Sequence, residues 1–185
     1  MQKEFIGKGS LNKIKCIVNE IKPKKILLVT GKKSFLSSGA SNKINSLLRN
    51  FNIIIFNDFQ SNPKIEDVKC GIGLFKSYNP DLIIAIGDGS AINMAKMINI
   101  LSVQKDSKLT DYIKNPLLIK RRGIPLVAVP TTIGTGSEST QFSVACNTSH
   151  DSSQTVAVYV PCIFNSWIVE QFELYSHPGY GIEII

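Results

Sequence analysis

The sequence predicts an α/β domain built on a parallel sheet that is flanked by helices. Short apolar runs rich in β-forming residues alternate along the chain with amphipathic helical stretches, an order typical of parallel sheets with crossover helices. The runs are continuously apolar rather than alternating, which suits strands covered on both faces. Apolar residues make up 43% of the 185 residues, enough to form a folded core.

The expected strands cover residues 25–30, 52–57, 81–86 and 125–129. Apolar residues recur at helical spacing over residues 11–21, 65–75 and 90–101, which predicts an amphipathic helix before or after each strand. Residues 34–50 give a weaker helical pattern, because Gly39 lies inside it. Ligands of such folds bind at the carboxyl ends of the strands, so we expect the functional residues there.

Charge and hydropathy exclude two classes of partner. No apolar run approaches the roughly 18 residues of a membrane span, and the N-terminus lacks the apolar segment of a secretory signal. All 21 Lys and Arg lie in residues 1–122, but few aromatics are interleaved with them, so we interpret them as a solvated surface. The sequence therefore predicts a cytoplasmic protein with no nucleic-acid or membrane partner.

The four cysteines have neither zinc-site nor redox-pair spacing, so we interpret Cys16, Cys70, Cys146 and Cys162 as small buried side chains. The two histidines, His150 and His177, stand alone in the sequence. No metal site is predicted in this chain.

Two glycine-rich loops carry the strongest functional signal. The strand that ends at Ile86 continues as Gly87-Asp88-Gly89-Ser90 and then directly as a helix. Glycines let the backbone approach a phosphate, and the free N–H groups of a helix start favour an anion; a tight turn without a ligand is the alternative. The strand that ends at Val129 is followed by PTTIGTGSE at residues 130–138, whose hydroxyls suit a ribose, a pyrophosphate or a carboxamide.

These segments resemble the iron-containing (group III) alcohol dehydrogenases, relatives of glycerol dehydrogenase and dehydroquinate synthase. The similarity is carried by IIAIGDGSAINMAKMIN at 83–99 and GIPLVAVPTTIGTGSEST at 123–140, and it covers roughly residues 3–144. It implies that residues 1–144 are the Rossmann-like, dinucleotide-binding N-terminal domain of the dehydroquinate synthase-like fold. The helical metal-binding domain of the family is absent from these residues.

The resemblance also implies which residues bind the nicotinamide cofactor. The first loop would hold the pyrophosphate, and the threonines of the second would line the nicotinamide and ribose. Members selective for NAD have an acid where this chain has Gly31, followed by Lys32 and Lys33, so we expect NADP to be favoured over NAD. The implied residues are Gly31, Gly87, Asp88, Gly89, Ser90, Asn93, Thr131, Thr132 and Thr135.

Two of these positions depart from the family's pattern. Asp88 stands where a glycine is usual; an aspartate tolerates the same left-handed backbone, but its charge would face the pyrophosphate if it pointed inward. Asn93 stands where an aspartate is usual, and it keeps the shape and a hydrogen-bonding oxygen while losing the charge.

The activity implied is hydride transfer between a nicotinamide cofactor and a small primary alcohol or aldehyde, with phosphonoacetaldehyde reductase-like members as one possibility. The family holds a divalent metal, iron or zinc, with one aspartate and three histidines of its helical domain, and the intact protein is expected to be a homodimer. Two alternatives are a nucleotide-binding remnant without catalysis and a lyase fragment of the dehydroquinate synthase type, although the PTTIGTGSE loop favours the dehydrogenase.

Residues 145–185 do not resemble the family's continuation, and with residues 123–144 they lack any Lys or Arg. We interpret them as an atypical tail, read from a shifted frame or poorly ordered; a genuine divergent tail is the alternative. Its candidate metal ligands, His150, Asp151, Glu173 and His177, have no helical His-x-x-x-His pairing. We therefore expect no catalytic residue in this chain and no activity from the chain alone.

Overall fold

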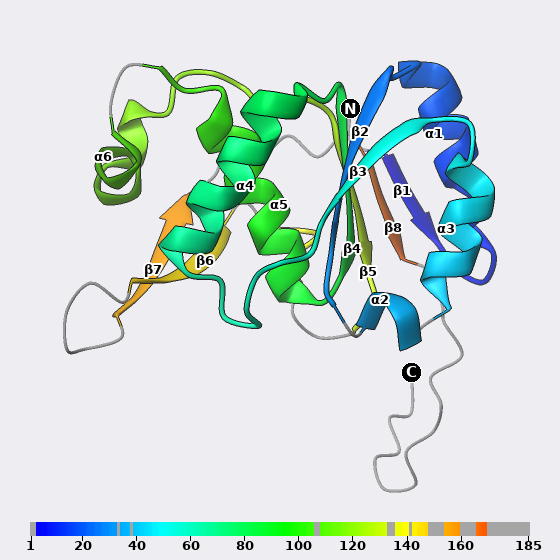
Figure 1. The fold of residues 1–185 in the computed structure, drawn as a ribbon. Helices are drawn as coiled ribbons and strands as arrows, with labels where there is room; N and C mark the ends of the chain where they lie inside the picture. Colours follow the sequence, from blue (N-terminus) through cyan, green and yellow to red (C-terminus); the bar gives the residue numbers. More distant parts are fainter. Residues whose placement is uncertain are drawn as a thin grey trace, which may run out of the picture.

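A six-stranded sheet forms the centre of the protein (Figure 1), and every pair of neighbouring strands in it is parallel. The computed structural model describes residues 3–32, 34–37, 39–105, 108–132, 136–140, 142–147, 154–159 and 166–169. The strand order is β1-β8-β5-β4-β2-β3. The strands are β1 (Lys3–Ile6), β2 (Lys25–Thr30), β3 (Asn52–Phe56), β4 (Leu82–Gly87), β5 (Leu126–Pro130) and β8 (Ser166–Val169). The predicted α/β class is confirmed.

Helices cover both faces of this sheet. α4 and α5 lie on one face, and α1 and α3 lie on the other (Figure 1). The predicted helix over residues 34–50 is instead two helices, because Gly39 between them has a φ of 71°. The helices are α1 (Lys13–Ile21), α2 (Ser34–Ser37), α3 (Ala40–Leu48), α4 (Ile65–Tyr78), α5 (Gly89–Ser102) and α6 (Leu109–Lys114), with short 3-10 turns at Ser10–Asn12 and Pro116–Leu118.

The central strands are continuously apolar because each face of the sheet has its own core. Along β2, Leu27 and Val29 belong to the core beneath α4 and α5, whereas Ile26 and Leu28 belong to the core beneath α1 and α3. All four side chains are buried, and each contributes about 1.5–3 kcal/mol by leaving water. This pattern fixes the register of β2 against β4, since a slip of one residue would exchange the two faces.

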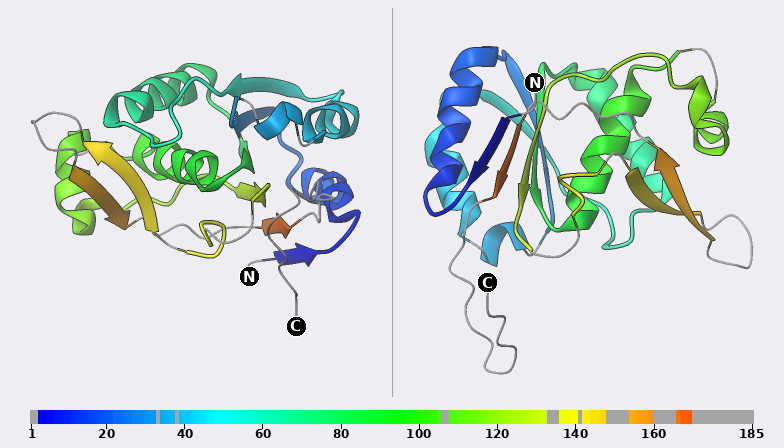
Figure 2. Two further views of the ribbon diagram at one scale, coloured as in Figure 1. Left: turned by 90° about the horizontal axis from the view of Figure 1, so that it is seen from below. Right: turned by 180° about the vertical axis from the view of Figure 1, so that it is seen from behind.

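Helix α5 is almost completely enclosed by the rest of the domain. Every residue of α5 except Ser90 and Asn93 is buried. A hairpin of β6 (Phe142–Asn147) and β7 (Gln154–Tyr159) lies on the same side of the molecule (Figures 1 and 2). The hydroxyl of Ser143 in β6 donates to the carbonyl oxygen of Asn93 at 2.8 Å, which ties the hairpin to the helix.

The main sheet includes a strand from beyond residue 144, where the predicted cofactor-binding domain ends. β8 lies between β1 and β5, and its Trp167 aligns with Glu4 on one side and Ala128 on the other. Neither β1 nor β8 is among the predicted strands. The residues of β1 are mostly exposed, so their sequence lacks the apolar run that marks the central strands.

Two of the cysteines lie on the surface of helices. The prediction that the cysteines are buried is wrong for Cys16 and Cys70, which lie exposed on α1 and α4. Within the described part of the chain, no helix has both the length and the apolar character needed to cross a membrane.

Candidate functional site

The two glycine-rich loops leave the sheet side by side. β4 and β5 are neighbouring parallel strands in which Gly87 aligns with Pro130, so both loops begin at the same edge, as the sequence predicts. The backbone N–H of Thr131 donates to the carbonyl oxygen of Gly87 at 2.8 Å and joins the two loops at their roots. Figure 2 (left) looks at the molecule from this edge.

Asp88 caps the first turn of α5. Its carboxylate accepts hydrogen bonds from the backbone N–H groups of Ser90 at 3.0 Å and Ala91 at 3.1 Å. Its backbone is extended, with φ −73° and ψ −176°, rather than in the left-handed conformation that an aspartate also tolerates. This extended backbone is typical of an N-cap residue, and the positive φ of the turn, 155°, falls at Gly87.

Ser90 and Asn93 are the two positions at which α5 is open. They are three residues apart and therefore lie on one face of the helix, and both are half-buried. The Ser90 hydroxyl donates to the backbone carbonyl oxygen of Ser61, which belongs to the loop after β3. This contact brings a third loop to the same edge of the sheet.

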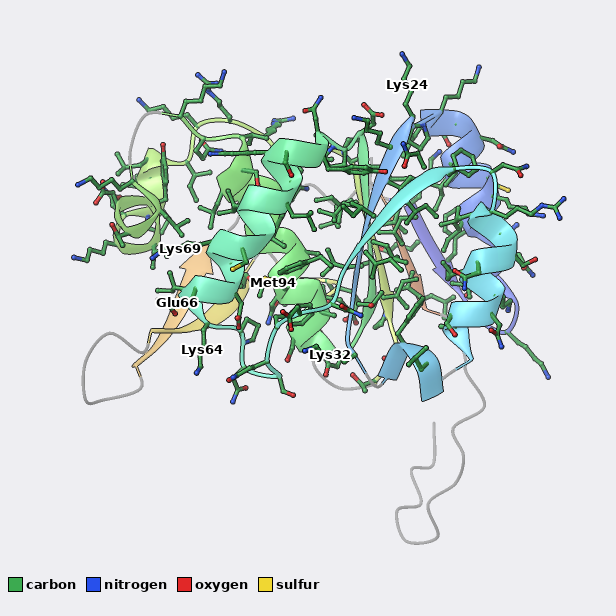
Figure 3. All side chains as sticks on the ribbon, in the orientation of Figure 1. Lys24, Lys32, Lys64, Glu66, Lys69 and Met94 are labelled. Atoms are coloured by element: carbon green, nitrogen blue, oxygen red, sulfur yellow. The ribbon has the colours of Figure 1, made fainter. Side chains whose placement is uncertain are left out.

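A cleft of about 460 Å³ opens where these loops meet. Its volume falls within the roughly 300–1,000 Å³ of typical small-molecule sites. The segments that follow β2, β3 and β4 provide its walls, and Lys32, which is labelled in the lower middle of Figure 3, marks its position. The lining residues are Gly31, Lys32, Phe59, Gln60, Ser61, Asp88 and Ser90.

Lys32 is held by an acid at the rim of this cleft. Its Nζ lies 2.6 Å from Oδ1 of Asp58, and both side chains are exposed. The hydrogen bond from Lys32, together with its charge, holds the pKa of Asp58 below the ordinary value. Of the two lysines that follow Gly31, Lys32 is therefore paired with an acid, and Lys33 lies outside the described residues.

The threonine loop is described only in part. Thr131 is half-buried and Thr132 is exposed. The Oγ1 atom of Thr131 is buried and has no hydrogen-bond partner among the described residues. A buried hydroxyl without a partner is costly, and Thr131 is not among the residues that line the cleft. Thr135 lies outside the described residues.

A buried lysine anchors the chain that continues from this loop. Lys96 of α5 is completely buried, and its Nζ donates to the carbonyl oxygen of Thr140 at 2.7 Å and contacts its hydroxyl at 3.3 Å. A buried ammonium group requires such partners to offset its lost hydration. The contact fixes the entry to β6 against the middle of α5.

The structure thus brings Gly31, Asp88 and Ser90 into one cleft and adds residues that the sequence analysis does not select. Phe59, Gln60, Ser61 and Asp58 come from the segment between β3 and α4. The rule that ligands bind at the carboxyl ends of strands could have pointed to this segment. The position of β3 beside β2, however, is a property of the sheet order.

The described residues offer no site for a metal ion. No group of three or more His, Cys, Asp or Glu side chains is close enough within the described ranges to hold one. The four candidate ligands of the tail, His150, Asp151, Glu173 and His177, all lie outside those ranges.

Comparison with known proteins gives a consistent result. A family model described as iron-containing alcohol dehydrogenase matches residues 2–169. The NADH-dependent butanol dehydrogenase A of Clostridium acetobutylicum is 36% identical over 149 residues, 78% of this chain and 37% of that protein. The NADPH-dependent butanol dehydrogenase of Clostridium saccharobutylicum is 35% identical over 144 residues, 76% of this chain and 36% of that protein.

Among solved structures, sulfoacetaldehyde reductase from Bifidobacterium kashiwanohense in complex with NAD+ is similar with a TM-score of 0.79 and 26% identity. The similarity covers 91% of this chain and 44% of that one. The chain therefore spans less than half the length of these relatives. Because the family match continues to residue 169, the expected end of the resemblance at residue 144 is wrong.

Proposed function

Because the chain belongs to the iron-containing alcohol dehydrogenase family, we propose that it is the nicotinamide-cofactor half of an oxidoreductase. The reaction is hydride transfer between the cofactor and a small primary alcohol or aldehyde. The cofactor supplies the hydride chemistry, and the protein binds and orients it. The homodimer that the resemblance implies stays a prediction.

One observation supports the cofactor site above all. The loops after β4 and β5 are joined by the Thr131–Gly87 hydrogen bond, and a cleft opens beside the first of them. The pyrophosphate would lie at the start of α5, and Thr131 and Thr132 would face the ribose and nicotinamide. Gly89, Asn93 and Thr135 remain proposed cofactor-binding residues with them.

NADP remains the favoured cofactor in this proposal. Gly31 itself has no acidic side chain, and Lys32 can move from Asp58 to a 2′-phosphate because both side chains are exposed. Among the relatives, one butanol dehydrogenase is named as NADH-dependent and another as NADPH-dependent, so the family name does not decide between the cofactors.

The proposed substrate is a short aldehyde with an anionic group. The similarity to a sulfoacetaldehyde reductase supports this class, and phosphonoacetaldehyde has the same chemical character. We expect the 185-residue chain by itself to bind cofactor without turnover, because the family's metal ligands are implied to lie in a helical domain and no metal-holding group occurs among the described residues.

The first test is binding of NADPH and NADH to the purified chain, measured by nicotinamide fluorescence. Gly31→Asp should weaken NADPH binding about tenfold more than NADH binding, because a carboxylate would face the 2′-phosphate. Gly73→Asp is the matched control, since Gly73 lies exposed on α4 with nothing within 4 Å of an added Cβ. Equal effects of Gly31→Asp on both cofactors would contradict the proposed placement of the adenosine ribose.

The second test is turnover. The chain is supplied with Fe²⁺ or Zn²⁺ and NADPH, and cofactor oxidation is monitored with a panel of short aldehydes. We expect binding with no oxidation above background. Oxidation that a chelator abolishes would show that the chain carries a complete metal site.

A further inference from the structure

We propose that the Asp88 carboxylate competes with the cofactor for the start of α5 and thereby lowers the affinity of this chain for dinucleotides. The inference rests on the proposed function, because it concerns the same cleft. Asp88 would then be a specificity-determining residue that disfavours a pyrophosphate at a site whose backbone is otherwise shaped to receive one.

The start of α5 has few backbone N–H donors that are free to bind a ligand. A helix begins with four backbone N–H groups that have no partner within the helix, and these groups with the helix dipole form an anion site. In α5, Asp88 already accepts from the N–H groups of Ser90 and Ala91. The carboxylate thus sits on the two donors that a pyrophosphate would use.

The other donors of the cleft, the Ser90 hydroxyl and the Lys32 ammonium, also have partners within the protein. The Ser90 hydroxyl donates to the carbonyl oxygen of Ser61, and the Lys32 ammonium pairs with Asp58. Both groups are therefore engaged by the protein before any ligand arrives. An incoming phosphate must exchange these contacts as well as displace Asp88, so each of its gains is partly offset.

The negative charge of Asp88 also acts against an anionic ligand. Asp88 lines the cleft, so if its side chain rotates away from the helix start it remains beside the pyrophosphate as a second negative group. Like charges a few ångströms apart repel, and the half-buried position of Asp88 reduces the screening by water. Displacement and repulsion act in the same direction and weaken binding of an anionic ligand.

Two variants separate displacement from repulsion. Asp88→Gly removes both the cap and the charge, whereas Asp88→Asn removes the charge and keeps an oxygen that can cap the helix. We expect the dissociation constant of NADPH to fall about tenfold or more in Asp88→Gly and by a smaller factor in Asp88→Asn, because the first variant removes both the competing acceptor and its charge, whereas the second removes the charge alone. Inorganic pyrophosphate, measured by calorimetry, should show the same order.

Asp111→Asn is the matched control. Asp111 accepts from the backbone N–H of Lys108 at 3.1 Å and so caps the start of α6, away from the cleft (Figure 1). Its replacement should leave NADPH and pyrophosphate binding unchanged. Without ligand, Asp88→Gly should unfold at a lower temperature than the parent chain, because a helix cap is lost.

The outcomes distinguish this inference from the proposed function. If the parent chain binds NADPH and Asp88→Gly and Asp88→Asn bind it no more tightly, the competition by Asp88 is refuted and the cofactor site stands. If neither the parent nor either variant binds NADPH or pyrophosphate, the cofactor site itself is refuted, and the inference falls with it. Should Asp88→Gly fail to fold, the comparison of Asp88→Asn with the parent decides the charge component alone.

Discussion

Individual charged side chains determine how the cleft interacts with an anionic ligand. Lys32 and Asp58 meet at its rim, and because both side chains are exposed, solvent and salt screen the pair and it is weak. The pKa of Asp58 is lowered by Lys32, so the pair persists above that lowered pKa and is lost only as the pH falls through it. Near neutral pH, Asp58 therefore competes with any phosphate for Lys32.

Asp58→Asn should raise the ratio of NADPH affinity to NADH affinity by about threefold, the size expected when an exposed ion pair is released. Lys32→Met should lower the same ratio. Both ratios are measured by fluorescence titration with the two cofactors. Glu20→Gln is the control, because Glu20 forms an exposed ion pair with Lys3, which lies outside the residues that line the cleft. An unchanged ratio in Asp58→Asn would show that Lys32 does not contact the 2′-phosphate of the adenosine ribose.

At the scale of elements, the close approach of α4 to α5 depends on one glycine. A Cβ added at Gly71 of α4 would lie 2.6 Å from Cγ1 of Ile98 in α5 and 3.1 Å from Cε1 of Phe56 in β3. Gly73 lies two residues further along α4, and nothing stands within 4 Å of its added Cβ. A side chain at position 71 would therefore clash with the core, whereas one at position 73 would meet open space.

Gly71→Ala should destabilise the chain by about 1–3 kcal/mol, because the methyl group overpacks the core between the helices. Gly73→Ala should stabilise it by about 0.5–1 kcal/mol, because alanine favours the helix. Urea unfolding of the two variants and the parent measures both changes. The packing account fails if the two substitutions have effects of the same sign.

The elements that the sequence predicted are those whose pattern is complete within a short window. The four central strands lie within one residue of their predicted ends, because burial on both faces makes each one a continuous apolar run. β1 has no such run, and β8 has only the three apolar residues of a four-residue strand. The two strands pair only because the chain returns across the sheet. A pairing between residues so far apart in sequence is invisible to local periodicity.

Some residues of the candidate site were likewise predictable from a local motif, and others were not. The loops that contain Gly87 and Thr131 were predicted because glycines and hydroxyls after a strand form a local motif. Phe59 and Ser61 line the cleft only because of the order of the strands, which the sequence did not reveal. The capping role of Asp88 depends on its conformation, and the residue type alone permitted both the left-handed and the extended backbone.

At the scale of the whole molecule, β8 joins two parts of the sheet that would otherwise not meet. Among the described strands it is the sole neighbour of β1 and one of two neighbours of β5. The backbone groups of β1 therefore depend on residues 166–169 for their sheet hydrogen bonds.

A chain ending at residue 165 should lose hydrogen-exchange protection at the amides of β1, while those of β2 and β4 stay protected, because their mutual pairing is untouched. A chain ending at residue 169 is the control, since it keeps β8 and lacks only residues 170–185. Exchange measured by mass spectrometry on peptides from both chains gives the difference. Equal protection of β1 in the two truncated chains would show that β8 is not its partner in solution.

The enclosure of α5 has a consequence for how this sequence can change over generations. Inward-facing positions accept few substitutions because interiors are closely packed, and α5 has such positions along its whole length except at Ser90 and Asn93. Selection for a stable fold and selection for a ligand would then act on separate positions of one helix. New ligand preferences could arise at residues 90 and 93 while the rest of the helix stays constrained by its neighbours.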